Sequence, residues 1–147
     1  MDDNNTQAKE AIGRSRGGLT TKIHLSTDES GRIKRLLLTG GQTSDVKVSL
    51  DLVQGFKATK LIADKAYDAD WLLYYLHSED IEAVIPPKRS RLQQRTTDYQ
   101  AYKQRNVIER TINKLKQYRK IATRYEKTAQ SFAALCFLAT SFININT

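Results

Sequence analysis

The stretch TKLIADKAYDADWLLYYLHSEDIEAVIPP, residues 59–87, decides the fold. It holds two short apolar runs, Thr59–Ala63 and Ile81–Ile85, of the kind that form strands buried on both faces of a sheet. Between them, apolar residues recur at helical spacing: Trp71, Leu72, Tyr75 and Leu76. Asp68 or Asp70 is expected to open this helix, and Trp71 to anchor it in the core. A strand, a helix and a second strand in this order predict an α/β fold.

The residues before this stretch predict a hairpin and one more helix. Thr20–Ser26 and Arg32–Thr39 alternate polar and apolar residues, and Asp28–Gly31 supplies the turn between them. A helix is expected over Asp45–Gln54, capped by Thr43 or Ser44. Because a hairpin cannot form the centre of such a sheet, a further strand is expected beside it.

The residues after it predict two helices that follow a basic loop at 88–97. The first helix runs from about Asp98 to about Lys120, and the second from about Thr128 to Phe142. The whole order predicts a mixed sheet flanked by helices. We expect one such domain over residues 19–147, preceded by a mobile polar segment at 1–18.

Charge, cysteine content and the uncharged end of the chain limit the kinds of function that this protein can have. The chain has 147 residues and a net charge of +8, but residues 88–127 alone carry +10 and the rest sums to −2. Such a basic segment is typical of a protein that binds polyanions, although a solvated basic helix would have the same charge. The one cysteine, Cys136, excludes an internal disulfide and a cysteine zinc site. The uncharged end, residues 128–147, is interrupted by polar residues, so we expect a buried helix and no membrane span.

Asp64 is the first candidate for chemistry. It directly follows the strand predicted to end at Ala63, and reactive groups in open α/β sheets gather at the carboxyl ends of strands. The alternative is that an aspartate of this run only caps the next helix. Asp68 and Asp70 fit that alternative better, because they stand next to the helix start.

The long helix carries a second set of candidates. Four polar or charged residues fall within an arc of roughly 60°, namely Tyr102, Arg105, Glu109 and Lys116. A neighbouring apolar stripe should face the core, and it consists of Ala101, Ile108, Ile112 and Leu115. Glu109 borders that stripe among cations, which suits a ligand of a divalent metal. The alternative is a surface ladder of ion pairs that joins Glu109 to Arg105 and Arg110.

The spacing Tyr102-x2-Arg105-x3-Glu109-x6-Lys116 resembles the Y-R-E-K signature of bacterial insertion-sequence transposases of the DDE class. Three further blocks are similar to one branch, insertion-sequence family five: GRSRGGLTTKIH from Gly13, LIADKAYDADWL from Leu61 and IEAVIPP from Ile81. The resemblance covers residues 8 to 140.

The resemblance implies a ribonuclease-H-like fold and metal-dependent cleavage and transfer of DNA strands. Asp64 and Glu109 would be catalytic ligands of two Mg2+ or Mn2+ ions, since such ions prefer oxygen. Tyr102, Arg105 and Lys116 would hold DNA near the metals. Weaker candidates for DNA contacts are Arg14, Arg16 and the basic loop.

The chain also departs from the family. The family's first Asp should lie on an opening strand before the Gly13 block, and the twelve residues there do not form a strand pattern. We therefore expect a core that lacks its first strand, is inactive or weak alone and is poorly soluble. It would be the downstream product of a frameshifting element, partnered by the upstream product, or a decayed remnant.

Two other functions are compatible with the same residues. A DNA-binding fragment that inhibits an intact transposase is the alternative function, and a nuclease unrelated to transposition is the third. The resemblance further implies dimers on paired DNA ends, in the bacterial cytoplasm at the nucleoid.

Overall fold

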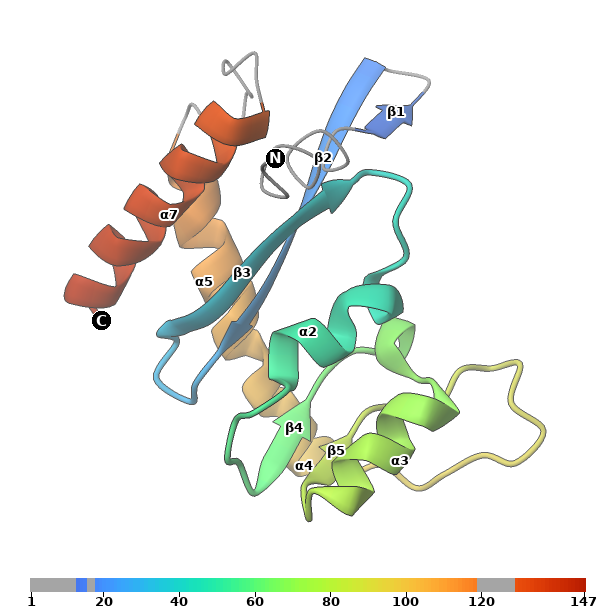
Figure 1. The fold of residues 1–147 in the computed structure, drawn as a ribbon. Helices are drawn as coiled ribbons and strands as arrows, with labels where there is room; N and C mark the ends of the chain where they lie inside the picture. Colours follow the sequence, from blue (N-terminus) through green and yellow to red (C-terminus); the bar gives the residue numbers. More distant parts are fainter. Residues whose placement is uncertain (1–12, 16–17, 119–128) are drawn as a thin grey trace. The chain divides into compact units, whose positions relative to one another are not determined.

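The computed structural model describes residues 13–15, 18–118 and 129–147, and the chain folds as two compact units (Figure 1). The hairpin unit comprises the described parts of Met1–Thr43 and Val107–Thr147. The central unit comprises Ser44–Asn106.

The hairpin unit is built on an antiparallel sheet with the strand order β1-β2-β3. Its elements are β1 (Gly13–Ser15), β2 (Gly18–Thr27), β3 (Ile33–Gly40), most of α5 (Asn106–Gln117) and α7 (Ala129–Ile145). The predicted hairpin and its turn are confirmed. The Asp28 carboxylate accepts the backbone N–H groups of Ser30 and Arg32, and Gly31 takes a left-handed φ of 90° that favours glycine.

Apolar side chains of β2, β3, α5 and α7 form the core of the hairpin unit, and Figure 1 shows the two helices beside the hairpin. The buried members are Leu25, Ile33, Leu36, Leu115, Phe132, Cys136, Ala139 and Ile143. Ile108 and Ile112 pack against this cluster, so the predicted apolar stripe of the long helix is confirmed. The side-chain amide of Asn144 joins α7 to β3, because it accepts from the backbone nitrogen of Ile33 at 2.9 Å and donates to its carbonyl oxygen at 3.1 Å.

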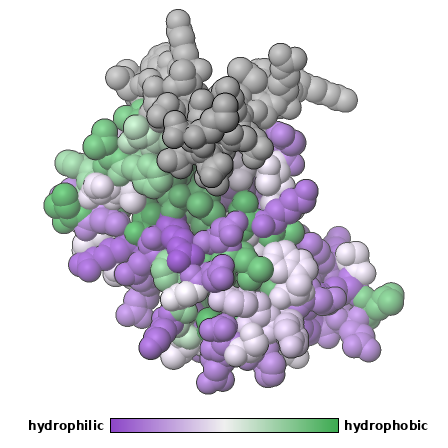
Figure 2. All heavy atoms as spheres, viewed as in Figure 1, coloured by the Kyte–Doolittle hydropathy of each residue, from purple (hydrophilic) through white to green (hydrophobic). Residues whose placement is uncertain are grey.

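The far side of α7 leaves four large apolar side chains exposed, and Figure 2 shows apolar colour over this helix. They are Phe137, Leu138, Phe142 and Ile145. No helix within the described part of the chain is long and apolar enough to cross a bilayer.

The central unit alternates short helices with a parallel pair of strands, β4 and β5. Its elements are the 3-10 turn η1 (Asp45–Val48), α2 (Ser49–Val53), β4 (Lys60–Ile62), the 3-10 turn η2 (Lys65–Tyr67), α3 (Asp70–Ser78), β5 (Glu82–Val84), α4 (Tyr99–Tyr102) and the 3-10 turn η3 (Lys103–Arg105). Leu72 and Leu76 bury one face of α3, as predicted. The predicted strand–helix–strand order over residues 59–87 is therefore confirmed.

Four expectations about this architecture are wrong in detail. The single mixed sheet is found as two separate sheets in the described residues, one antiparallel and one parallel. Lys60 is exposed and the rest of β4 is only half-buried, because β4 has just β5 beside it there. Trp71 is 44% exposed, so Leu72 and Leu76 anchor α3 in its place. Ser44 occupies the cap position of η1, but its side chain makes no capping hydrogen bond.

The predicted long helix is interrupted. Asp98 caps α4 by accepting the N–H groups of Gln100 and Ala101, η3 follows, and α5 continues the helix to Gln117. A 3-10 turn advances by about 120° per residue against 100° in an α-helix, so the predicted arc, which assumed one regular α-helix, does not hold across Lys103–Arg105. The expected ends at Lys120 and Thr128 lie outside the described residues.

Candidate functional site

Asp64 lies at the carboxyl end of β4, two residues after Ile62. It is the N-cap of η2, and its Oδ1 accepts the backbone N–H of Ala66 at 2.7 Å. Asp70 is the first residue of α3, as predicted. The alternative that Asp68 or Asp70 caps this helix is wrong, since the cap position is Ala69 and no side chain caps it. A carboxylate has about four acceptor sites, so one capping bond orients Asp64 without using up its oxygens.

The charges of two carboxylates, those of Asp64 and Asp45, act on Tyr67. Burial raises the pKa of the Tyr67 phenol to about 12, and the negative charges of Asp45 and Asp64 add to this effect. Both charges therefore act at the same half-buried ring.

Two of the predicted DNA contacts, Tyr102 and Arg105, meet within the central unit. The Arg105 guanidinium carbon lies 5.5 Å from the centre of the Tyr102 ring, a cation–π contact. The exposed Tyr99 meets Tyr102 edge to face at 6.1 Å between ring centres. An arginine stacked on a tyrosine presents a planar donor group in a restrained position, which suits a phosphate contact.

The other predicted site residues lie in the hairpin unit or outside the described chain. Glu109 and Lys116 are exposed on α5, and Glu109 stands next to the partly buried Ile108 as expected. Arg14 lies on β1, whereas Arg16 is outside the described residues. Among the residues that the structure describes, no three His, Cys, Asp or Glu side chains gather where they could hold a metal ion.

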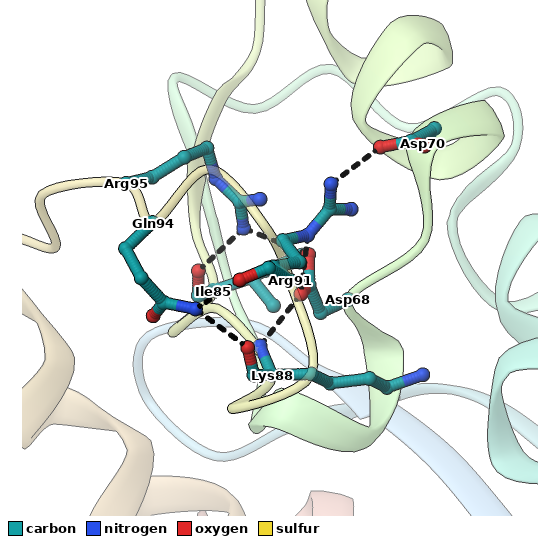
Figure 3. Close-up of polar contacts among 7 residues, drawn as sticks. All are labelled: Asp68, Asp70, Ile85, Lys88, Arg91, Gln94 and Arg95. Carbon is teal, nitrogen blue, oxygen red and sulfur yellow. Dashed lines mark hydrogen bonds and ion pairs between the residues drawn. The ribbon is translucent and has the colours of Figure 1, made fainter.

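Asp68 forms a cluster that the sequence analysis missed (Figure 3). Its side chain is fully buried and accepts from the Lys88 backbone nitrogen at 2.7 Å, Arg91 Nε at 2.7 Å and Arg95 Nη2 at 2.8 Å. Burial alone would raise the pKa of Asp68, but the hydrogen bonds from Arg91, the Lys88 backbone and Arg95 lower it to about 2. Asp68 is thus an ionised anchor for the basic loop.

Further hydrogen bonds shape this loop around Asp68 (Figure 3). Arg91 Nη1 reaches Asp70 at 2.7 Å, and Arg95 Nη2 also donates to the Ile85 carbonyl at 3.2 Å. Gln94 Nε2 donates to the carbonyls of Lys88 and Arg91, at 2.9 and 3.0 Å. The predicted basic loop therefore has a defined shape without helix or strand. The basic residues that follow β5 in the sequence indicated that a carboxylate could lie near them. The sequence did not identify that carboxylate as Asp68.

Comparisons with known proteins agree on one family. A family model described as "Transposase DDE domain" matches residues 3–143. A Brucella ovis protein, named as a transposase for insertion sequence element IS6501, is 39% identical over 129 residues, which are 85% of this chain and 98% of that protein. A Burkholderia cepacia protein, named as a transposase for IS402, is 28% identical over 146 residues, covering 91% of this chain and 66% of that protein. No solved structure matches.

Proposed function

This chain belongs to the DDE family of insertion-sequence transposases, and on that premise we propose that it is the catalytic-core portion of a DNA transposase. The observation that carries the proposal is the family match over nearly the whole chain, which includes both Asp64 and Glu109. The motif order supports the finer assignments, a ribonuclease-H-like fold and insertion-sequence family five. DNA, at transposon ends and at the target, would be the substrate.

We assign Asp64 and Glu109 as catalytic ligands of divalent ions, two Mg2+ or Mn2+ in a complete enzyme. Their carboxylate oxygens have the chemistry that these ions prefer. The orientation of Asp64, whose Oδ1 accepts the Ala66 N–H at 2.7 Å, supports this assignment. Such ions, when bound, stabilise the attacking and leaving oxygens of a phosphodiester during in-line displacement.

The chain's cations would position the DNA backbone at these carboxylates. Arg105, held against Tyr102, would donate to a phosphate, and Lys116 on α5 would supply a second contact. Arg14 and Arg16 are the remaining candidates, both in the Gly13 block. Their part would be affinity without sequence readout, because phosphate contacts carry no base information.

We further propose that the chain alone is inactive or weak. Two carboxylates are too few to hold two ions firmly, so a third ligand is required from another segment. The product of an upstream reading frame would supply it, and a second copy of the chain would complete a dimer on paired ends. The place of action would be the nucleoid of a bacterial cell.

The test is nicking of a supercoiled plasmid that carries the element's ends, with Mg2+. We expect activity from the chain fused to the upstream product, and loss of activity on Asp64→Asn or Glu109→Gln. Glu79→Gln, an exposed acid at the end of α3, is the control that should retain activity. Mn2+ binding, measured by electron paramagnetic resonance, should weaken in the same two variants. Strong nicking by the isolated chain that Asp64→Asn abolishes would contradict the proposal of weak activity, and cleavage without strand joining would indicate a plain nuclease.

A second function, a DNA-binding fragment that competes with an intact transposase, is favoured by the basic segment. Residues 88–127 carry a net charge of +10, and the loop within this segment takes its shape from Asp68, without either proposed metal ligand. Under this alternative, Glu109→Gln leaves DNA binding unchanged and the chain inhibits an intact transposase in trans. Under the leading proposal, the fused product cleaves DNA.

A further inference from the structure

We propose that the loop at residues 88–97, here called the Asp68 loop, is a preformed DNA-contacting element whose residue Leu92 inserts between bases while Lys88 and Arg89 hold phosphates. This inference rests on the proposed function, because it takes DNA as the substrate. The charge of the loop alone would suggest only phosphate contacts, and the insertion of Leu92 between bases is the added element.

The first support is that the Asp68 loop is already shaped. Asp68 accepts one backbone N–H and two arginine side chains of the loop, and all three distances are 2.8 Å or less. The turn itself is closed by the Arg91 backbone nitrogen, which donates to the Lys88 carbonyl at 3.1 Å. A loop whose conformation is set before binding loses less entropy when it meets its partner.

The second support is that the cations of the loop fall into two groups, those paired with aspartates and those whose side chains point elsewhere. Arg91 and Arg95 are engaged by Asp68, and Arg91 by Asp70 as well. Lys88 contacts Asp68 only through its backbone N–H in this cluster, and its side chain extends away from the carboxylate (Figure 3). Arg89 is exposed. Lys88 and Arg89 are therefore placed to meet phosphates, while the other two cations hold the loop.

The third support is Leu92, which is fully exposed next to the anchored Arg91. Figure 2 shows a small apolar spot within a hydrophilic surface where the loop projects. A single exposed leucine is ordinary on a protein surface. Here, however, it stands between cations on a loop that a buried carboxylate holds in place, and it gains no burial in the folded chain.

These features fit DNA better than an acidic protein. Leucine is among the side chains that proteins insert between base steps, and the unstacking cost of a few kcal/mol per step is offset by added contact area. Cations at Lys88 and Arg89 would grip the phosphates that flank the opened step. An acidic protein would pair with the cations but would offer Leu92 no stack to enter.

The experiment measures DNA binding and base unstacking together with the full chain. The probe is a short fluorescein-labelled duplex of mixed sequence, and a matched duplex carries 2-aminopurine, whose fluorescence rises when it is unstacked. The variants are Leu92→Ala, Lys88→Gln and Arg89→Gln. Leu138→Ala, which truncates an exposed leucine on α7, is the control. Arg89, Leu92 and Leu138 are exposed and Lys88 is half-buried, so folding should survive.

We expect the wild-type chain to bind the duplex and to raise the 2-aminopurine signal. Leu92→Ala should abolish that rise and weaken binding about 3- to 10-fold, with an unchanged salt dependence. Lys88→Gln and Arg89→Gln should each lower the slope of log Kd against log salt by about one. Leu138→Ala should change neither quantity.

Three results would overturn the inference. If the chain binds the duplex but the 2-aminopurine signal stays flat, or rises equally in Leu92→Ala, the wedge is refuted while the proposed function stands. If Leu92→Ala instead changes the oligomeric state in sedimentation, Leu92 belongs to a protein interface. If the wild-type chain binds no DNA at all, the proposed function and the inference fail together.

Discussion

Replacing Asp68 by asparagine tests whether the buried carboxylate stabilises the central unit. The pKa of Asp68 falls from 3.8 to about 2, because hydrogen bonds from Arg91, the Lys88 backbone and Arg95 outweigh burial. At about 1.4 kcal/mol per pKa unit, this shift corresponds to about 2 kcal/mol of folding stability. Removing one partner of a fully buried ion pair costs about 3–5 kcal/mol. The partners here are 23% and 33% exposed, so we expect about 2–3 kcal/mol for Asp68→Asn at neutral pH.

The sign of the pH dependence follows from the lowered pKa. The unfolded chain binds a proton at Asp68 near pH 3.8, and the folded chain binds it only near pH 2. The stabilisation is therefore complete above about pH 5 and is lost as the pH falls toward about 2. Asp68→Asn has no proton to bind at this position. The difference in stability between wild type and variant should shrink over that range.

The assay is urea unfolding followed by the fluorescence of Trp71, the only tryptophan, which lies on α3 of the same unit. Asp70→Asn removes the same charge from an 87% exposed partner of Arg91 and should cost less than about 0.5 kcal/mol. Trypsin should also cleave the Asp68 loop faster in Asp68→Asn. If Asp68→Asn matches Asp70→Asn in stability, or if both chains lose stability in parallel as the pH falls, the reasoning is refuted.

Three further predictions concern the hairpin unit. Gly31→Ala should lower the free energy of unfolding by about 1–2 kcal/mol, because the φ of Gly31 is 90° and the new Cβ would lie 3.1 Å from Thr111 Oγ1. An unchanged midpoint of urea unfolding would contradict this prediction. Burial raises the pKa of the Cys136 thiol to about 11, so a disulfide reagent at about pH 8 should react slowly with the folded chain and rapidly in urea. Equal rates would mean that the thiol is exposed. Asn144→Ala should lower the free energy of unfolding by about 1–2 kcal/mol, because the backbone N–H and carbonyl of Ile33 lose their partner. The control in the same unfolding assay is Asn146→Ala, at an exposed position.

The parts of the fold that could be predicted from the sequence depend on neighbours along the chain. The hairpin follows from alternation and from the turn at Asp28–Gly31, and the apolar stripe of α5 follows from periodicity. Contacts between distant residues were not predictable in this way. Asn144 bonds to Ile33 across 111 positions, and nothing local to either residue indicates it.

Trp71 shows why residue type alone misled. A lone tryptophan in a helix is usually a core residue, yet Trp71 is 44% exposed while Leu72 beside it is 1% exposed. The helix can bury only one face, and Trp71 and Tyr75 have the same four-residue spacing as the buried Leu72 and Leu76. The spacing therefore predicted an amphipathic helix but did not determine which of the two neighbouring pairs is buried.

The three aspartates in the run from Asp64 to Asp70 show what a structure adds to a candidate site. By sequence they compete for one catalytic role and one capping role, and apart from the family signature only their distances from the strand end and the helix start distinguished them. The structure assigns Asp68 and Asp70 to arginines of a loop some twenty residues further on, which leaves their charges largely compensated. Asp64 meets a backbone N–H instead and contributes its charge beside Tyr67. A metal ligand needs a carboxylate whose charge is not already neutralised by an arginine. Elimination within this run therefore favours Asp64, on grounds that are independent of the family signature.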